Sequence, residues 1–195
     1  IGFIHDIVSN TTVPASKLRT VSKIIDDEAL INNELLTLIS WVAKYYHHPI
    51  GEVYATAVPL YLRQEKTPKI DSTLEESFQQ EAHKKLTEEQ EKGFEKILSL
   101  FNKRPVVLLD GVTGSGKTEV YLNLTEKLIK DGKQVLVLVP EIGLTPQMIA
   151  RFEERINERV VAVHSQLNET QKQDAYLLAK NGEAKVILGT RSAIF

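Results

Sequence analysis

The strongest constraint in this sequence is a glycine-rich octapeptide, GVTGSGKT, at residues 111–118, which directly follows the apolar stretch VVLLD at 106–110. The octapeptide fits the pattern G-x-x-x-x-G-K-[S/T], and the segment after it, EVYLNLTEKLIK, is typical of a helix. Glycines let the backbone turn successive N–H groups inward, and these donors join the positive end of the helix dipole to form a cradle for phosphate. The sequence therefore predicts a nucleotide-binding loop between a buried strand and a helix.

Two side chains in this loop have direct chemical roles in the predicted site. Lys117 is long enough to reach the β and γ phosphates, and the Thr118 hydroxyl can hold the Mg²⁺ ion that bridges them. The alternative, a chance glycine turn, would produce the bare pattern about once in a hundred chains of this length. We expect nucleotide contacts from Gly111, Val112, Thr113, Gly114, Ser115, Gly116, Lys117 and Thr118.

The sequence leaves open which carboxylate would complete the metal site for hydrolysis, a step that also needs an acid on the water shell of the metal. The run QVLVLVPE ends in Glu141, which an apolar strand could deliver to the metal, although Pro140 intervenes. Glu119 and Asp110 also lie near the loop in sequence, but we expect them to be a first-turn helix acid and a turn residue.

Gln90, in the segment LTEEQEKGFEKIL, also has two interpretations. Its side-chain amide could bind an adenine edge with one donor and one acceptor. The run from Thr87 to Gln90 is also typical of a capping box, in which Gln90 only closes the start of a helix. The residue pattern alone favours the cap.

From residue 86 onward, apolar strands alternate with amphipathic helices, a pattern typical of a parallel sheet in a three-layer α/β domain. Strands are expected at 106–110, 134–139, 160–163 and 185–189, and helices near 117–131, 145–157 and 169–181.

The upstream part has a different pattern and is separated from the rest by a polar linker at 64–85. Two strands are expected at 1–8 and 17–25, then a helix at 28–46 capped by Asp26 or Asp27, and a short second helix between Pro49 and Pro59. On the first helix we expect the single tryptophan, Trp41, to lie in the core beside Tyr45 and Tyr46.

Composition excludes several classes of protein. Apolar residues make up 42% and charged residues 26% of the 195 residues, as in ordinary globular proteins. No apolar stretch reaches the length of a membrane span and no signal peptide is recognisable, so a cytoplasmic location is expected. The chain has no cysteine, which excludes thiolate zinc sites within these residues, and none of the five histidines is expected to bind metal.

Four segments in this order, GVTGSGKTEVYL, LVPEIGLTPQM, VHSQLNE and ILGTRSAIF, resemble the first motor lobe of superfamily 2 helicases. Together with WVAKYYHHPIGEVYATAVPLYLR upstream, they resemble the bacterial replication-restart, or primosomal, DNA helicases. The resemblance implies a P-loop NTPase (RecA-like) lobe at 86–195, preceded by the later part of an α+β 3′-end DNA-binding domain at 1–63. It also implies ATP with Mg²⁺ as cofactors, and DNA, single-strand binding protein and primosome proteins as partners.

The resemblance also assigns individual residues. It places Gln90 at the adenine, against the preference from the residue pattern. It moves the segment after Pro140 from the metal to the DNA backbone, a role suited to hydroxyls, backbone N–H groups and a guanidinium. The implied DNA contacts are Pro140, Thr145, Gln147, Gly189, Thr190 and Arg191.

Several family features fall outside this sequence. We expect the acidic metal-binding motif to follow residue 195, and the second motor lobe and cysteine-rich zinc module to lie elsewhere in the parent. The family's winged-helix domain does not fit in 64–85, so either this relative has lost that domain or it was removed. The chain is therefore expected to be an internal fragment with weak or absent ATPase activity. The alternative function is a self-contained P-loop kinase or small-molecule NTPase with Glu141 as the magnesium acid.

Overall fold

The computed structural model describes residues 2–26, 29–63, 85–101, 103–104, 106–140, 143 and 145–195. The chain divides into two compact units, which we describe separately. The first holds residues 1–69, 168–173 and 195, and the second holds 70–167 and 174–194. Among the described residues, no helix has both the length and the apolar character needed to cross a bilayer.

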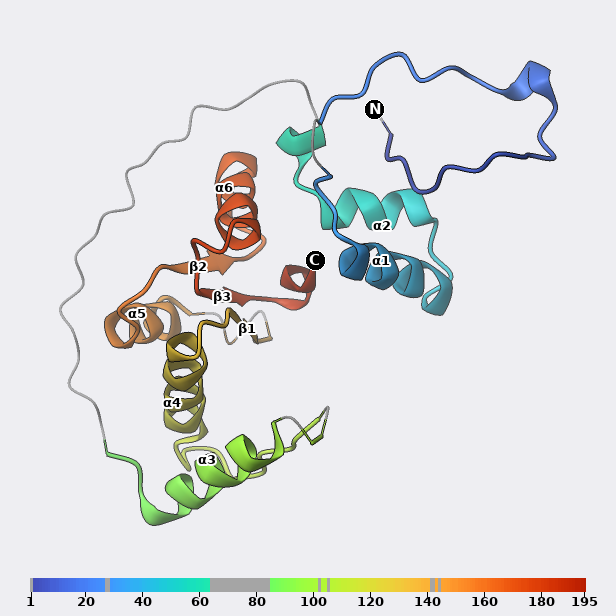
Figure 1. The fold of residues 1–195 in the computed structure, drawn as a ribbon. Coiled ribbons are helices and arrows are strands. Elements are labelled where there is room, and N and C mark those ends of the chain that lie inside the picture. The colour runs from blue at the N-terminus through green and yellow to red at the C-terminus, as the bar shows by residue number, and fades with distance from the viewer. Residues whose placement is uncertain are drawn as a thin grey trace. The chain divides into compact units, whose positions relative to one another are not determined.

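The second unit contains a small parallel sheet (Figure 1). Its strands are β1 (Val135–Leu138), β2 (Val160–Val163) and β3 (Val186–Gly189), in the spatial order β1-β3-β2. Leu138 and Val163 are both in register with Gly189, so all three strands end at the same edge. The predicted parallel arrangement is confirmed for these three strands.

The helices of this part lie close to the positions that the sequence predicts. They are α3 (Glu88–Leu100), α4 (Lys117–Lys130), α5 (Pro146–Arg155) and α6 (Glu169–Lys180), of which residues 169–173 are grouped with the first unit. A 3₁₀ turn, η4 (Arg191–Ile194), follows β3. Proline at the first position of α5 suits a helix start, because that residue needs no intrahelical N–H donor. The Thr145 side chain caps α5 by accepting from Met148 N at 3.2 Å.

Two buried clusters hold these elements together. In the first, Leu122 of α4 and Phe152 of α5 pack with Ile156, Val186 and Leu188. In the second, Ile97 of α3 packs with Val120 and Leu124 of α4. Helix α4 therefore contributes to both clusters, and the glycine-rich loop at 111–116 leads directly into this packed helix.

The expected strand at 106–110 does not form, and that prediction was wrong for this structure. A strand exists only through hydrogen bonds to a neighbour, and none of the described strands pairs with this segment. Leu109 packs against the α3–α4 cluster, whereas Val106 and Leu108 are 82% and 86% exposed. The sheet therefore has three strands among the described residues, not the four that the sequence predicts.

The first unit is built on α1 (Asn33–Tyr45) and α2 (Ile50–Ala57), followed by the 3₁₀ turn η2 (Leu60–Arg63), and another 3₁₀ turn, η1 (Ala15–Lys17), precedes them. The buried side chains are Ile39 on α1 and Val53, Tyr54 and Ala57 on α2. As expected, α2 begins after Pro49 and ends before Pro59.

Three predictions for this unit were wrong. No strand forms within the described residues 2–26, because no described segment pairs with the two apolar runs there. Helix α1 begins at Asn33 and not at residue 28. The Asn32 side chain caps it by accepting from Leu35 N at 2.8 Å, so Asp26 is not the cap. Asp27 lies outside the described residues.

The third wrong prediction concerns the aromatic residues of α1. Trp41, Tyr45 and Tyr46 are 51%, 62% and 64% exposed. Trp41 stacks on Tyr45, and Tyr46 contacts both rings edge-on. The buried side of α1 is the one that carries Ile39, and this group of three aromatic residues lies outside that core cluster.

Replacing Phe152 with alanine should lower the free energy of unfolding by about 3–5 kcal/mol, because its fully buried ring joins α5 to α4 and β3. Chemical denaturation followed by far-UV circular dichroism measures this loss. The matched control is Phe101→Ala, since Phe101 is 44% exposed and its loss should cost less than about 1 kcal/mol. Equal losses for the two variants would contradict the assignment of Phe152 to the core.

Candidate nucleotide-binding site

The loop at 111–116 contains two glycines in the left-handed region, Gly114 at φ +83° and Gly116 at φ +79°. Residues with a Cβ rarely adopt this conformation, so glycine is required at both positions. Gly116 is the N-cap of α4, and Ser115 N donates to Val112 O at 3.2 Å within the loop. The backbone therefore turns sharply just before the N-terminal end of a helix of 14 residues.

Lys117 is the first residue of α4, and its side chain folds back over the loop. The Nζ atom donates to the carbonyl oxygens of Gly111 and Val112, the latter at 3.0 Å. The ammonium and the N-terminal end of α4 both favour an anion. Thr118 follows in the first turn and is half-buried. The donor set fits a phosphate group and a hydroxyl-held Mg²⁺ ion.

Gln90 does more than either interpretation of the sequence alone implied. The capping box is confirmed, because Thr87 N donates to Gln90 Oε1 at 3.0 Å and Gln90 N donates to Thr87 Oγ1 at 3.3 Å. In addition, Gln90 Nε2 donates to Ser115 O at 3.0 Å. One side chain thus closes the start of α3 and holds the glycine-rich loop, and its role at an adenine stays a prediction.

The approach of Gln90 depends on Gly116. A Cβ on Gly116 would lie 2.3 Å from Gln90 Nε2, a distance shorter than any van der Waals contact. Gly116 is therefore favoured by its positive φ, and a side chain at this position would also displace the glutamine amide.

Of the acids considered near the loop, Asp110 is exposed and Glu141 lies outside the described residues. Glu119 lies in the first turn of α4, as expected. Its carboxylate also forms ion pairs with Arg151 at 2.5 Å and Arg155 at 3.4 Å, both on α5. Sequence reasoning missed these pairs, because the residues lie more than 30 positions apart and no local pattern links them. Among the described residues, no three His, Cys, Asp or Glu side chains gather as metal ligands.

The predicted DNA contacts lie mostly at the carboxyl edge of the sheet. Pro140 follows β1, Gly189 ends β3, and Val139 N donates to Gly189 O at 2.9 Å. After β3, Thr190 is 8% exposed and Arg191 is exposed. The structure thus brings the segments after β1 and β3 together at one edge of the sheet.

The other two predicted DNA contacts lie at the start of α5. Thr145 is the N-cap of this helix, and Gln147 is exposed in its first turn. The Thr145 hydroxyl is occupied in part by the cap, which leaves further lone-pair capacity and the hydroxyl proton for another partner.

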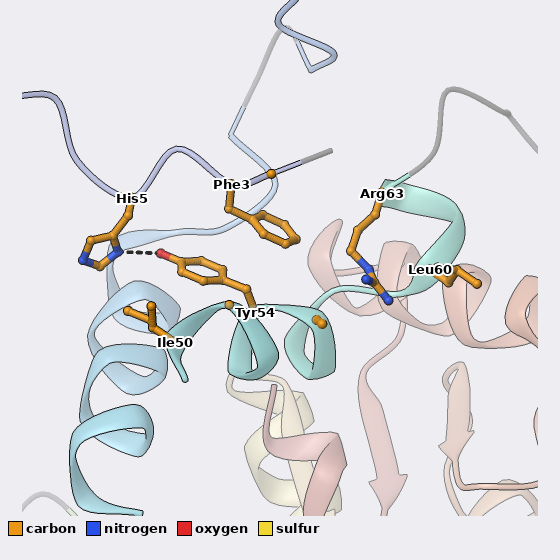
Figure 2. Close-up of a pocket in the computed structure, with 9 residues that line it drawn as sticks. Phe3, His5, Ile50, Tyr54, Leu60 and Arg63 are labelled. Atoms are coloured by element: carbon orange, nitrogen blue, oxygen red, sulfur yellow. Dashed lines mark hydrogen bonds between the residues drawn. The ribbon is translucent and has the colours of Figure 1, made fainter. Parts of the chain in front are cut away.

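The first unit has a separate pocket of about 480 Å³ (Figure 2). Phe3 stacks on Tyr54 with ring centroids 4.8 Å apart, and His5 Nδ1 lies 2.7 Å from the Tyr54 hydroxyl. Burial raises the pKa of Tyr54 above its ordinary value. Arg63, at another wall, donates from Nε to Val58 O at 3.1 Å. None of these residues was predicted as a functional residue from the sequence.

Two family models match the chain. One, described as the 3′ DNA-binding domain of PriA, matches residues 1–59. The other, described as "Type III restriction enzyme, res subunit", matches residues 75–195, which is more than half of the chain.

Several curated proteins named "Replication restart protein PriA" are similar to this chain. The protein from Haemophilus influenzae is 51% identical over 112 residues, covering 56% of this chain and 15% of that protein. The Rickettsia felis protein is 35% identical over 185 residues, which cover 94% of this chain and 28% of that protein. The Rickettsia conorii protein is 32% identical over 194 residues, which cover 100% of this chain and 29% of that protein. The chain thus spans less than a third of each of these relatives.

Replacing Gly116 with alanine should destabilise the chain more than the same change at Gly132, which has φ +77° but no atom within 4 Å of the position that a Cβ would take. In both variants the free energy of unfolding should fall by about 1–2 kcal/mol, because alanine is strained in the left-handed conformation. Only Gly116→Ala should also displace the Gln90 side chain and break its hydrogen bond to Ser115, which lowers the free energy of unfolding by about 1 kcal/mol more. Chemical denaturation of both variants measures the difference, and equal losses would contradict the Gln90 contact.

Proposed function

The chain belongs to the PriA family of replication restart proteins, and we propose that it is part of a motor that uses ATP to move 3′ to 5′ along DNA and restart stalled replication forks. The observation that carries this proposal is the glycine-rich loop at the start of α4, with Lys117 folded over it. We also propose that residues 86–195 form part of a RecA-like motor lobe. The parallel sheet and the family-model match to residues 75–195 support this part of the proposal.

On the nucleotide side, residues 111–118 would hold the phosphates of ATP. Backbone N–H groups of the loop and the Lys117 ammonium would neutralise the phosphate charge, and the Thr118 hydroxyl would hold Mg²⁺. In the Gln90 side chain, Oε1 accepts one hydrogen bond and Nε2 donates one. Each atom can form one more hydrogen bond, and these would bind the adenine edge. The bound nucleotide supplies the free energy of the motor through hydrolysis.

On the DNA side, the sheet edge and the start of α5 would contact the strand backbone. The candidate contacts offer hydroxyls, an amide, a guanidinium and the N-terminus of α5, which are suited to phosphate oxygens and do not distinguish bases. A motor that moves along any sequence requires such contacts. We propose fork structures and single-stranded DNA as the substrates, and single-strand binding protein and primosome proteins as partners, in the cytoplasm.

The proposed domain boundaries are a DNA-binding part at 1–63, a linker at 64–85 and the motor lobe at 86–195. The linker is similarly short in the Rickettsia conorii protein, which aligns with the whole chain over 194 residues. We therefore propose that the winged helix is naturally absent from this chain. The relatives' names give no support to the alternative of a small-molecule kinase.

Replacing Lys117 with alanine should weaken the binding of Mg²⁺–ATP by at least about tenfold, because one charge-assisted hydrogen bond is worth about 1.5–3 kcal/mol. Isothermal titration calorimetry on the 195-residue chain measures the change. The control is Lys96→Ala, an exposed lysine on α3. Equal affinities for wild type and Lys117→Ala would refute the nucleotide site.

Replacing Arg191 with alanine should weaken the binding of single-stranded DNA and lower the slope of log affinity against log salt by about 1, because one phosphate contact is lost. Fluorescence anisotropy with a labelled oligothymidylate at several salt concentrations measures both. Arg159, which directly precedes β2 and therefore lies at the opposite edge of the sheet, provides the control. If Arg159→Ala had the same effect, the carboxyl edge would not be the DNA site.

A further inference from the structure

Four charged side chains form a cluster between α4 and α5 in the second unit, defined by Glu119, Glu126, Arg151 and Arg155. Glu119 pairs with Arg151 at 2.5 Å and with Arg155 at 3.4 Å, and Arg155 also pairs with Glu126. The side chains of Arg155 and Glu119 are only 4% and 12% exposed. Removing one partner would leave another charge buried and unpaired, so the cluster fixes the relative position of the two helices.

The positions of these residues along the helices connect two proposed sites. Glu119 lies two residues after Lys117, in the first turn of α4. Arg151 lies one helical turn after Gln147, which is in the first turn of α5. The Glu119–Arg151 pair therefore joins the phosphate-binding end of α4 to the helix whose start would contact DNA.

Apolar packing also joins α4 to α5. Leu122 and Phe152 are fully buried in one cluster, and neither depends on the charged residues for a partner. The Arg151 side chain is 37% exposed, whereas those of Glu119 and Arg155 are 12% and 4% exposed, so among these three its replacement disturbs the packing least. The ion pairs therefore set where the first turn of α4 lies relative to α5, beyond what packing requires.

We propose that Glu119 is a positioning residue that couples nucleotide binding at the loop to DNA binding at the start of α5 through its ion pairs with Arg151 and Arg155. This inference rests on the proposed function. A phosphate held by Lys117 shifts the first turn of α4, and Glu119 carries that shift to α5 because its carboxylate is bonded to both arginines. Coupling of this kind is reciprocal, so DNA binding changes nucleotide affinity by the same factor.

The test measures the affinity of the 195-residue chain for a labelled oligothymidylate with and without saturating Mg²⁺–ADP. For wild type, the ratio of the two dissociation constants should differ from 1 by about fivefold or more, in either direction. In Glu119→Gln and in Arg151→Gln the ratio should fall to within about twofold of 1, because the charge pair that carries the coupling is gone.

Lys127→Gln is the matched control, since it removes an exposed ion pair with Asp131 at the other end of α4 and should leave the ratio unchanged. Circular dichroism checks that each variant is folded. If Glu119→Gln does not fold, Arg151→Gln provides the test of the coupling. A wild-type chain that binds neither ligand would overturn the proposed function itself. A wild-type chain that binds both without coupling, or a Glu119→Gln variant that keeps the wild-type ratio, would overturn this inference alone.

Discussion

The left-handed backbone at Gly116 is the constraint on which the candidate site depends. It lets the chain turn directly into α4, and it leaves the space in which Gln90 reaches the carbonyl of Ser115. Helix α4 thereby begins directly at the loop, and the Gln90 side chain ties the start of α3 to the same loop through its bond to Ser115 O. A single residue without a side chain therefore decides both the course of the backbone and the position of its neighbour.

The parallel register of the sheet arranges the second half of the candidate site. Because Leu138, Gly189 and Val163 are aligned, segments that are distant in sequence leave the sheet at one edge. Helix α4 shares a buried cluster with α5 and β3, so the loop and this edge belong to one packed unit. A nucleotide held at the loop and a DNA strand held at this edge, as proposed, would therefore contact the same packed unit.

The sequence predicted features whose causes are local. The three paired strands have continuous apolar runs, and α4 and α5 start at a glycine-rich loop and a Thr-Pro pair, so their signals lie within a few residues. The strand at 106–110 failed because pairing depends on a neighbour that local pattern does not contain. The Glu119 ion pairs were missed for the same reason, since only the tertiary packing of α4 on α5 brings these charges together.

The exposed position of Trp41 has a practical consequence for spectroscopy. It is the single tryptophan of the chain, and it lies in the first unit, stacked on Tyr45 with ring centroids 4.8 Å apart. Indole emission therefore reports on the surroundings of α1. An extrinsic fluorophore, or a second indole introduced near α4, would report on the glycine-rich loop itself.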